Sequence, residues 1–262
     1  MSTSSNTQKQ VATVILAAGK GTRMKEPDRA KVMFELMGKP MIHYVADLAV
    51  ALGSARIIAV VGFQRESVMS YLRKTHPTVK FVVQEPQLGT GHAVQQAEKA
   101  LMDFSGDVLV LSGDVPLLTG ETLGAMRGLH EAAEAVATIL TAEVDDPTGY
   151  GRIIRNGTGA VEKIVEHRDA SAEELKVKEI NSGIYLFQKE KLFDGLNHIA
   201  PHNVQNEYYL TDVFEYFWKH HWTVAAFKAP HVDEIQGVNT REQLERAKEI
   251  LSSRLTPFPS GQ

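Results

Sequence analysis

An apolar run that ends in a basic glycine turn constrains this chain more than any other feature. Residues Val11–Ala18 are apolar, and the turn Gly19-Lys20-Gly21-Thr22-Arg23 follows at once. Such a run predicts a strand buried on both faces, as in a parallel sheet. Glycines let backbone N–H groups approach a ligand closely, and the two cations add positive charge. The turn therefore predicts a site for polyphosphate at a strand end, where open α/β sheets bind their ligands.

Two common phosphate-binding motifs do not fit this turn. A dinucleotide fingerprint, G-x-G-x-x-G, requires a third glycine where this chain has Met24. A Walker A loop requires four residues between its glycines, whereas a single residue separates Gly19 from Gly21. An ordinary strand-to-helix turn that happens to be basic remains the alternative interpretation.

The charge around the turn differs from that of the whole chain. Five cations and two acids lie between Lys20 and Lys31, while the chain carries a formal net charge of -4. A local basic loop on an acidic protein favours a small anionic ligand, because nucleic acid usually requires a broad basic face. We therefore expect no nucleic-acid partner. The simpler alternative is that the basic turn is a solvated surface loop.

Length and composition predict one soluble globular domain with a sizeable core, since the chain has 262 residues of which 43% are hydrophobic. The absence of cysteine excludes disulfides, thiolate catalysis and cysteine-bound zinc, and it agrees with a reducing, cytoplasmic location. No apolar run reaches transmembrane length, so we expect no membrane partner. We interpret His220 and His221 as cations that close a helix, and the histidines predict no zinc site.

Short apolar runs alternate with helical patterns along the first half of the chain. Strands are expected at 11–18, 56–61, 79–84, 108–111 and 136–143, and helices at 41–52, 65–74, 91–102 and 121–134. This alternation predicts a parallel sheet with helices on both faces. This alternation does not continue in the second half. There we expect a hairpin over 151–167, strands at 184–187 and 224–227, and helices at 209–220 and 241–255. We interpret this second half as an insertion that covers the ligand edge of the sheet.

Polar residues follow several of these elements. Asp114 comes after the strand at 108–111, and carboxylates together with substrate phosphates are typical Mg²⁺ ligands. A turn aspartate is the alternative, but beside the cationic loop a metal role is the better interpretation.

Gln87–His92 is a second glycine-rich turn, which either exposes helix N–H groups to an anion or is a plain loop with Thr90 as a cap. Glu166 and Asn181 either bind sugar hydroxyls or are surface residues.

Together these segments resemble sugar-nucleotide pyrophosphorylases. The resemblance rests on Leu16–Met24, Lys31, Gln84, Gln87–His92, Gly113–Pro116, Asp146–Arg152, Glu166–His167, Asn181 with Gly183, Asn206–Asp212 and Gly237–Asn239. The chain is most similar to the uridyltransferase half of the bifunctional bacterial N-acetylglucosamine-1-phosphate uridyltransferase/glucosamine-1-phosphate acetyltransferases, from about residue 11 to 250. The resemblance implies a Rossmann-like α/β nucleotidyltransferase with a mostly parallel mixed sheet. A nucleotide-binding half would span 11–143, and a sugar-binding lobe with a closing helix would span 144–255. Residues 1–10 would form a flexible tail at one end and residues 256–262 a tail at the other.

The resemblance also implies a reaction, in which UTP and N-acetylglucosamine 1-phosphate give UDP-N-acetylglucosamine and pyrophosphate. Asp114 and Asn239 would hold Mg²⁺, while Arg23 and Lys31 would stabilise charge on the phosphates. The nucleotide-binding residues would be Leu16, Ala17, Ala18, Gly19, Gly21, Gln84, Gly89, Thr90 and Gly113. The amino sugar would be bound by Gly151, Glu166 and Asn181.

The chain departs from the family pattern in several places. Ala30 stands where proline usually precedes the lysine, and the loop from Met24 to Lys31 is one residue longer. Nothing after Leu255 resembles the hexapeptide repeats of a left-handed β-helix, so we expect neither acetyltransferase activity nor the trimer that such repeats build. Two alternatives remain: a nucleotidyltransferase of the same fold for another sugar phosphate or base, and a non-catalytic nucleotide-sugar sensor.

Overall fold

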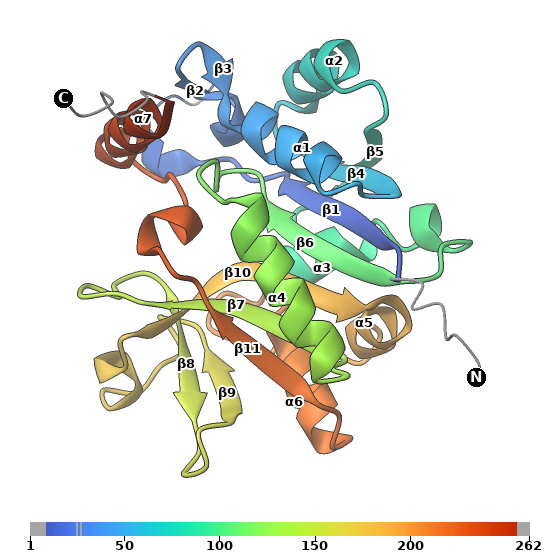
Figure 1. Ribbon diagram of the computed structural model, residues 1–262, viewed down its shortest axis with the longest axis vertical. Coiled ribbons are helices and arrows are strands. Elements are labelled where there is room, and N and C mark those ends of the chain that lie inside the picture. Colours follow the sequence, from blue (N-terminus) through green and yellow to red (C-terminus); the bar gives the residue numbers. More distant parts are fainter. Residues whose placement is uncertain (1–8, 25, 27, 256–262) are drawn as a thin grey trace, which may run out of the picture.

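A single mixed sheet organises the molecule (Figure 1). The computed structural model describes residues 9–24, 26 and 28–255, so the tails expected at 1–10 and 256–262 lie outside it except for Lys9 and Gln10. Within the described residues the main path of the sheet has the order β11-β7-β10-β6-β1-β4-β5, with β8 and β9 attached beside β10. These strands are β1 (Val11–Ala17), β4 (Arg56–Val61), β5 (Lys80–Val83), β6 (Asp107–Ser112), β7 (Ala137–Glu143), β8 (Gly151–Arg155), β9 (Val161–Val165), β10 (Glu179–Gln188) and β11 (Val224–Lys228).

The sheet is mostly parallel, as expected. β1 pairs in parallel with both β4 and β6, and β11 pairs in parallel with β7. β10 is antiparallel to both of its neighbours, β6 and β7. Because β10 comes from the second half of the chain, the sheet runs across the boundary expected at residue 143. The division into a nucleotide half and a sugar lobe stays a prediction.

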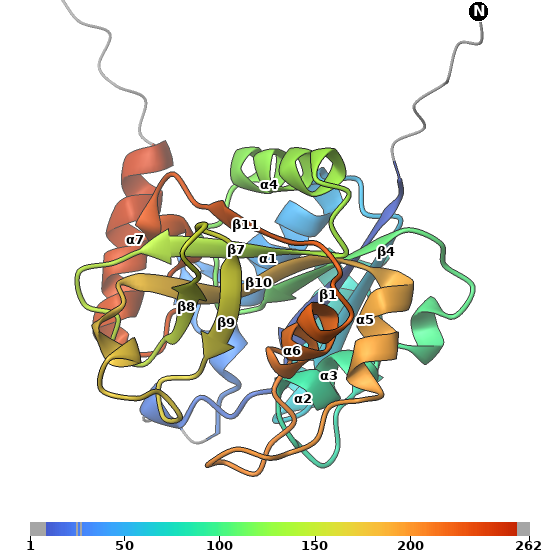
Figure 2. The ribbon, with the colours of Figure 1, turned by 90° about the horizontal axis from the view of Figure 1, so that it is seen from below.

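Helices cover both faces of this sheet, which confirms the predicted layers (Figure 2). α1 (Met41–Ala51), α2 (Arg65–Thr75) and α4 (Gly120–Ala132) pack with one apolar cluster, which includes Val45, Leu72, Met126 and Leu140. α3 (Thr90–Gln95), α5 (Lys189–Leu196) and α6 (Asp212–Lys219) pack with a second cluster on the other face. The two clusters lie on opposite faces because successive side chains of β1 point to opposite sides of the sheet. Ile15 joins the first cluster and Val14 joins the second.

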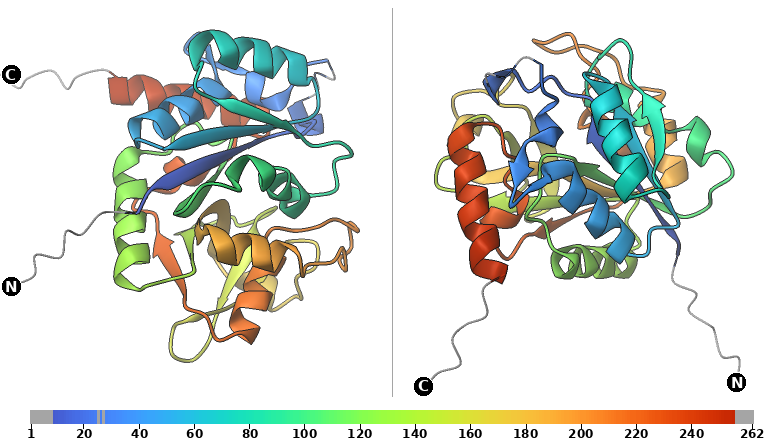
Figure 3. Two further views of the ribbon diagram at one scale, coloured as in Figure 1. Left: turned by 90° about the vertical axis from the view of Figure 1, so that its right-hand side faces the viewer. Right: turned by 90° about the horizontal axis from the view of Figure 1, so that it is seen from above.

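The closing helix α7 (Arg241–Leu255) lies beside the small hairpin of β2 (Glu35–Leu36) and β3 (Lys39–Pro40) (Figures 1 and 3). Its start is a capping box: Thr240 Oγ1 accepts from Gln243 N at 3.2 Å, and Gln243 Oε1 accepts from Thr240 N at 3.1 Å. Thr240 is thus the cap of this helix, and the cap fixes the segment just before it. In the part of the chain that the structure describes, each helix falls short of the length and apolar character that crossing a bilayer requires.

The structure differs from the local predictions in three places. The helix expected over 91–102 ends at Gln95. Beyond it, hydrogen bonds between residues three apart, such as Ala97 N to Val94 O, replace the α-helical pattern, and a short 3-10 turn follows at Lys99–Leu101. The eight-residue helix α5 was not predicted. β10 begins at Glu179 and not at residue 184, since a bulge between Asn181 and Tyr185 interrupts the alternation of side chains.

Candidate active site

Several loops meet at the carboxyl edge of the sheet. β1, β4 and β6 end there together because they are parallel, and β10 begins there because it is antiparallel. Two backbone bonds hold this edge: Gly113 N donates to Leu16 O at 2.9 Å, and Phe63 N donates to Ala18 O at 3.1 Å. The glycine turn after β1 and Asp114 after β6 are therefore neighbours, as the sequence predicted from strand polarity.

Four side chains predicted for phosphate and metal binding converge at this edge. Lys31 donates from Nζ to the Asp114 carboxylate and, at 2.6 Å, to Asn239 Oδ1. Arg23 donates from Nη2 to the same Asn239 oxygen at 2.6 Å. The side chains of Lys31 and Asp114 are only 14% and 19% exposed, so this contact is shielded from water on most sides. Three chain segments distant in sequence thus build one charged cluster.

The oxygen atoms of this cluster suit a hard cation. Asn239 Nδ2 donates to Gly237 O at 2.9 Å, which turns the amide oxygen toward the cations. Val238 N donates to Asp114 O at 2.9 Å, and a Cβ placed on Gly237 would lie 3.6 Å from Asp114 Oδ2. A carboxylate oxygen and an amide oxygen therefore reach the same positive centre, here the Lys31 ammonium, which is the donor chemistry that Mg²⁺ takes.

The glycine turn after β1 packs directly on Lys31. Gly21 has φ +65°, and a Cβ at this position would lie 2.5 Å from the Lys31 Cβ. A side chain is excluded there by both backbone strain and contact, so the turn reaches the lysine closely. Gly19, by contrast, has open space around it. The basic turn is therefore part of the charged cluster and not an isolated surface loop.

A second group of predicted residues lines a neighbouring cavity. Gln84, which is buried, donates to Gly89 O at 2.8 Å, and Gln87 donates to Ala18 O at 2.5 Å. These bonds tie the second glycine turn to the first one. Gln84 and Gln87 line a cavity of about 660 Å³ together with Lys20 and the start of α2. The Thr90 hydroxyl does not cap α3; it accepts from Leu210 N at 3.0 Å, while Gly89 occupies the cap position.

The three residues predicted for sugar binding also lie together. Gly151 pairs with Asn181 between β8 and β10, and a Cβ on Gly151 would lie 3.4 Å from both Glu166 carboxylate oxygens. Asn181 is buried and donates to Tyr185 Oη at 2.7 Å, so the alternative that it is a surface residue is wrong. Burial raises the pKa of Glu166, which accepts from Thr211 Oγ1 at 3.4 Å.

Sequence reasoning missed two residues that join these groups. Burial and the Asp114 charge raise the pKa of Tyr150, whereas the Arg23 charge lowers it, so its phenol lies in the field of the charged cluster. The next residue, Gly151, lies against Glu166. Thr211 was also missed, and with Glu166 it lines a cavity of about 700 Å³. Both lie in segments that carried the resemblance, Asp146–Arg152 and Asn206–Asp212, which was the available signal.

Comparison with known proteins agrees with this architecture. Residues 12–232 match a family model described as nucleotidyl transferase. Curated relatives named bifunctional protein GlmU are 48% identical over 242 residues in Halalkalibacterium halodurans and 46% identical over 245 residues in Pelotomaculum thermopropionicum. The alignments cover 92% and 94% of this chain but 52% and 53% of those proteins. The chain thus spans about half the length of the curated relatives that it matches.

Solved structures share the fold. A UDP-glucose pyrophosphorylase complexed with UDP-glucose superposes with a TM-score of 0.76, covering 94% of this chain and 99% of that one. A putative glucose-1-phosphate thymidylyltransferase from Bacillus anthracis gives a TM-score of 0.73 over 96% and 98% of the two chains. Sequence identity is 20% in both cases, so these similarities show the fold alone.

Proposed function

Because the chain belongs to the nucleotidyl transferase family, we propose that it transfers UMP from UTP to N-acetylglucosamine 1-phosphate and releases pyrophosphate. The observation that carries this proposal is the convergence of Arg23, Lys31 and Asp114 on and around the Asn239 side chain. Two cations beside two oxygen ligands make a site for a triphosphate with its metal. The 48% identity to a protein named bifunctional GlmU supports the choice within the family.

The proposed step is one displacement at phosphorus. A phosphate oxygen of the sugar phosphate bonds to the α-phosphorus of UTP, and the bond from that phosphorus to the bridging β-phosphate oxygen breaks. Pyrophosphate leaves with the electron pair of that bond. No side chain acts as a nucleophile, so the protein contributes positioning and stabilisation of charge.

Arg23 and Lys31 are the residues proposed to meet that charge. Both donate to Asn239 Oδ1 and therefore already lie in the charged cluster. Cations beside the phosphates stabilise the negative charge that develops in the transition state. Mg²⁺ held by Asp114 and Asn239 would supply further neutralisation of the phosphates when bound.

The remaining predicted residues are proposed to hold the two substrates. Gln84 would read the uracil, with Gly89 and Thr90 close to the base. The peptide groups from Leu16 to Gly19, with Gly21 and Gly113, would pack on the nucleotide. Gly151, Glu166 and Asn181 would bind the amino sugar, since a glycine beside a carboxylate leaves room for a sugar ring that hydrogen-bonds to it.

Pyrophosphate release across a substrate panel tests this proposal. The panel combines UTP, dTTP, CTP and ATP with N-acetylglucosamine 1-phosphate, glucose 1-phosphate and galactose 1-phosphate, each with Mg²⁺ and with EDTA. UTP with N-acetylglucosamine 1-phosphate and Mg²⁺ should give the highest kcat/KM. A preference for another pair would reject the substrate assignment and leave the nucleotidyltransferase chemistry. No release with any pair would favour the non-catalytic sensor.

A further inference from the structure

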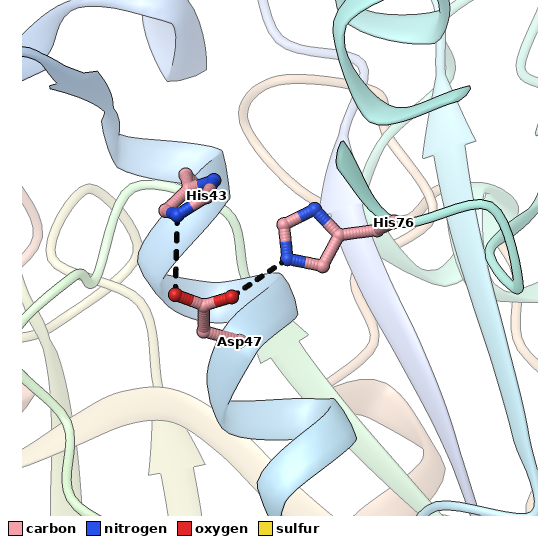
Figure 4. Close-up of side chains that lie close together, drawn as sticks. All are labelled: His43, Asp47 and His76. Carbon is pink, nitrogen blue, oxygen red and sulfur yellow. Dashed lines mark hydrogen bonds and ion pairs between the residues drawn. The ribbon is translucent and has the colours of Figure 1, made fainter. Parts of the chain in front are cut away.

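A cluster of two histidines and an aspartate lies on the α1/α2 side of the molecule (Figure 4). His43 and Asp47 are four residues apart on α1, and His43 Nε2 lies 3.2 Å from Asp47 Oδ2. His76, which follows α2, places its Nε2 2.8 Å from Asp47 Oδ1. No zinc site was expected among the histidines, although His43 and Asp47 have the i, i+4 spacing that places two ligands on one helix face.

Hydroxyl groups bind the other nitrogen of each ring. Thr75 Oγ1 lies 2.8 Å from His76 Nδ1, and Tyr71 Oη lies 3.1 Å from His43 Nδ1. Ligating histidines typically have a partner on the second nitrogen that fixes the ring and its tautomer. Both rings are enclosed, since His43 is 9% exposed and His76 is 5% exposed.

The Thr75 hydroxyl connects His76 to the end of α2. Its oxygen lies 3.0 Å from Tyr71 O and 2.8 Å from His76 Nδ1. On the other side of the ring, His76 Nε2 lies 2.8 Å from Asp47 Oδ1. In the tautomer with its proton on Nδ1, the Nε2 lone pair faces this carboxylate oxygen, so a cation between the two atoms would contact both.

We propose that His43, Asp47 and His76 form a binding site for a divalent transition-metal ion, Zn²⁺ in particular. Two imidazoles and one carboxylate are the ligand set of many zinc sites with a solvent position. Their ligand atoms all lie within 4.8 Å of one another. Ligands about 2.1 Å from a tetrahedral ion are about 3.4 Å apart, so small side-chain rotations suffice. Mg²⁺ prefers an all-oxygen set and does not fit here.

The surroundings define the rest of the site. The Asp47 side chain is 54% exposed, so an ion enters from solvent and a water completes its coordination. Burial lowers the pKa of His43, the Asp47 charge raises it and the Lys39 charge lowers it, so Lys39 is the positive charge that opposes a cation here. The ion would join α1 to the end of α2, and α1 also carries Ile42, whose side chain lies 3.0 Å from a Cβ placed on Gly113. Metal binding should therefore stiffen the layer beneath the active-site edge.

Calorimetric titration of the EDTA-treated, dialysed full chain with Zn²⁺ tests the proposal, with excess Mg²⁺ present to saturate the Asp114 site. One saturable equivalent should bind and should raise the Tm by about 5–10 °C at a hundredfold excess over Kd. Co²⁺ should give the intense visible bands of a tetrahedral site. Absence of a saturable equivalent would overturn the proposal.

Variants separate this site from adventitious binding to histidine. Asp47→Asn and His76→Gln should each weaken Zn²⁺ binding more than tenfold. Thr75→Val, an exposed change that leaves every ligand in place, should weaken it about tenfold, because the hydroxyl that holds His76 Nδ1 is lost. The matched control is His198→Gln, because His198 has an acid, Asp194, at the same spacing but is in no three-ligand group among the described residues. Equal binding by Asp47→Asn and the parent protein would contradict the assignment.

Discussion

Asn239 Oδ1 lies 2.6 Å from Lys31 Nζ, although 208 positions separate the two residues in the chain. The contact exists because the capping box of α7 fixes the segment before it and Val238 N donates to Asp114 O. Lys31 from the loop after β1, Asp114 from the loop after β6 and Asn239 just before α7 therefore share one charged cluster.

Arg23 is predicted to act on the transition state and not on substrate binding alone. Arg23→Ala should lower kcat for pyrophosphate release by about 10²–10³, because a preorganised cation at the phosphates is lost. Lys20→Ala, in the same exposed turn, is the matched control and should change kcat far less. Steady-state kinetics with both substrates varied makes the comparison. A rise in KM at constant kcat for Arg23→Ala would show uniform binding instead.

Gly89 is predicted to tolerate no side chain. It has φ +108°, and a Cβ there would lie 2.5 Å from Tyr208 O. Gly89→Ala should therefore lower the free energy of unfolding by about 1–3 kcal/mol and impair nucleotide binding. Gly124→Ala in α4 is the control, because nothing lies within 4 Å of its Cβ and the helix gains about 0.5–1 kcal/mol. Urea unfolding should move the two variants in opposite directions, and equal shifts would refute the steric argument.

Asp212 is predicted to make stability depend on pH. Burial first, and then the charges of Glu166, Glu215 and Asp169, raise its pKa to about 6. The folded protein thus holds this proton more tightly than the unfolded chain does, so the contribution of Asp212 to stability is complete below about pH 4 and is lost as pH rises through 6. Asp212→Asn should remove that loss and stabilise the protein by about 1–2 kcal/mol at pH 8, after allowing for solvent screening.

The control for Asp212 is Asp145→Asn, whose side chain is fully exposed. Urea unfolding at pH 4.5 and pH 8 should show a smaller pH difference for Asp212→Asn than for this control or the parent protein. Identical pH differences in all three proteins would mean that Asp212 ionises without cost.

Regular periodicity allowed most of the sheet to be predicted. β4 was expected at 56–61 and runs over Arg56–Val61, because a buried parallel strand is a plain apolar run. β10 was harder, since Asn181 and Gly183 look like turn residues while the bulge keeps the strand in the sheet. Its place between β6 and β7 depends on long-range packing and is not encoded in local pattern.

Individual residues of the candidate site could be predicted from the sequence more readily than the contacts between them. Strand polarity placed Asp114 and the glycine turn at one edge, and the resemblance supplied Asn239. No local signal indicated that Tyr150 would lie in the field of Asp114 and Arg23, since that depends on how the loop after β7 folds back. The pairing of His43 and Asp47 with His76 likewise arises only when α1 and the end of α2 pack together.

The most direct test of metal-assisted nucleotidyl transfer at this cluster is the single change Asp114→Asn. The change keeps the shape of the side chain and removes the charge that faces Lys31. Pyrophosphate release from UTP and N-acetylglucosamine 1-phosphate should fall by about 10²–10³ in kcat at saturating Mg²⁺, while the unfolding transition remains cooperative. The exposed Asp145→Asn should keep full activity. Parent-level turnover by Asp114→Asn would contradict the account.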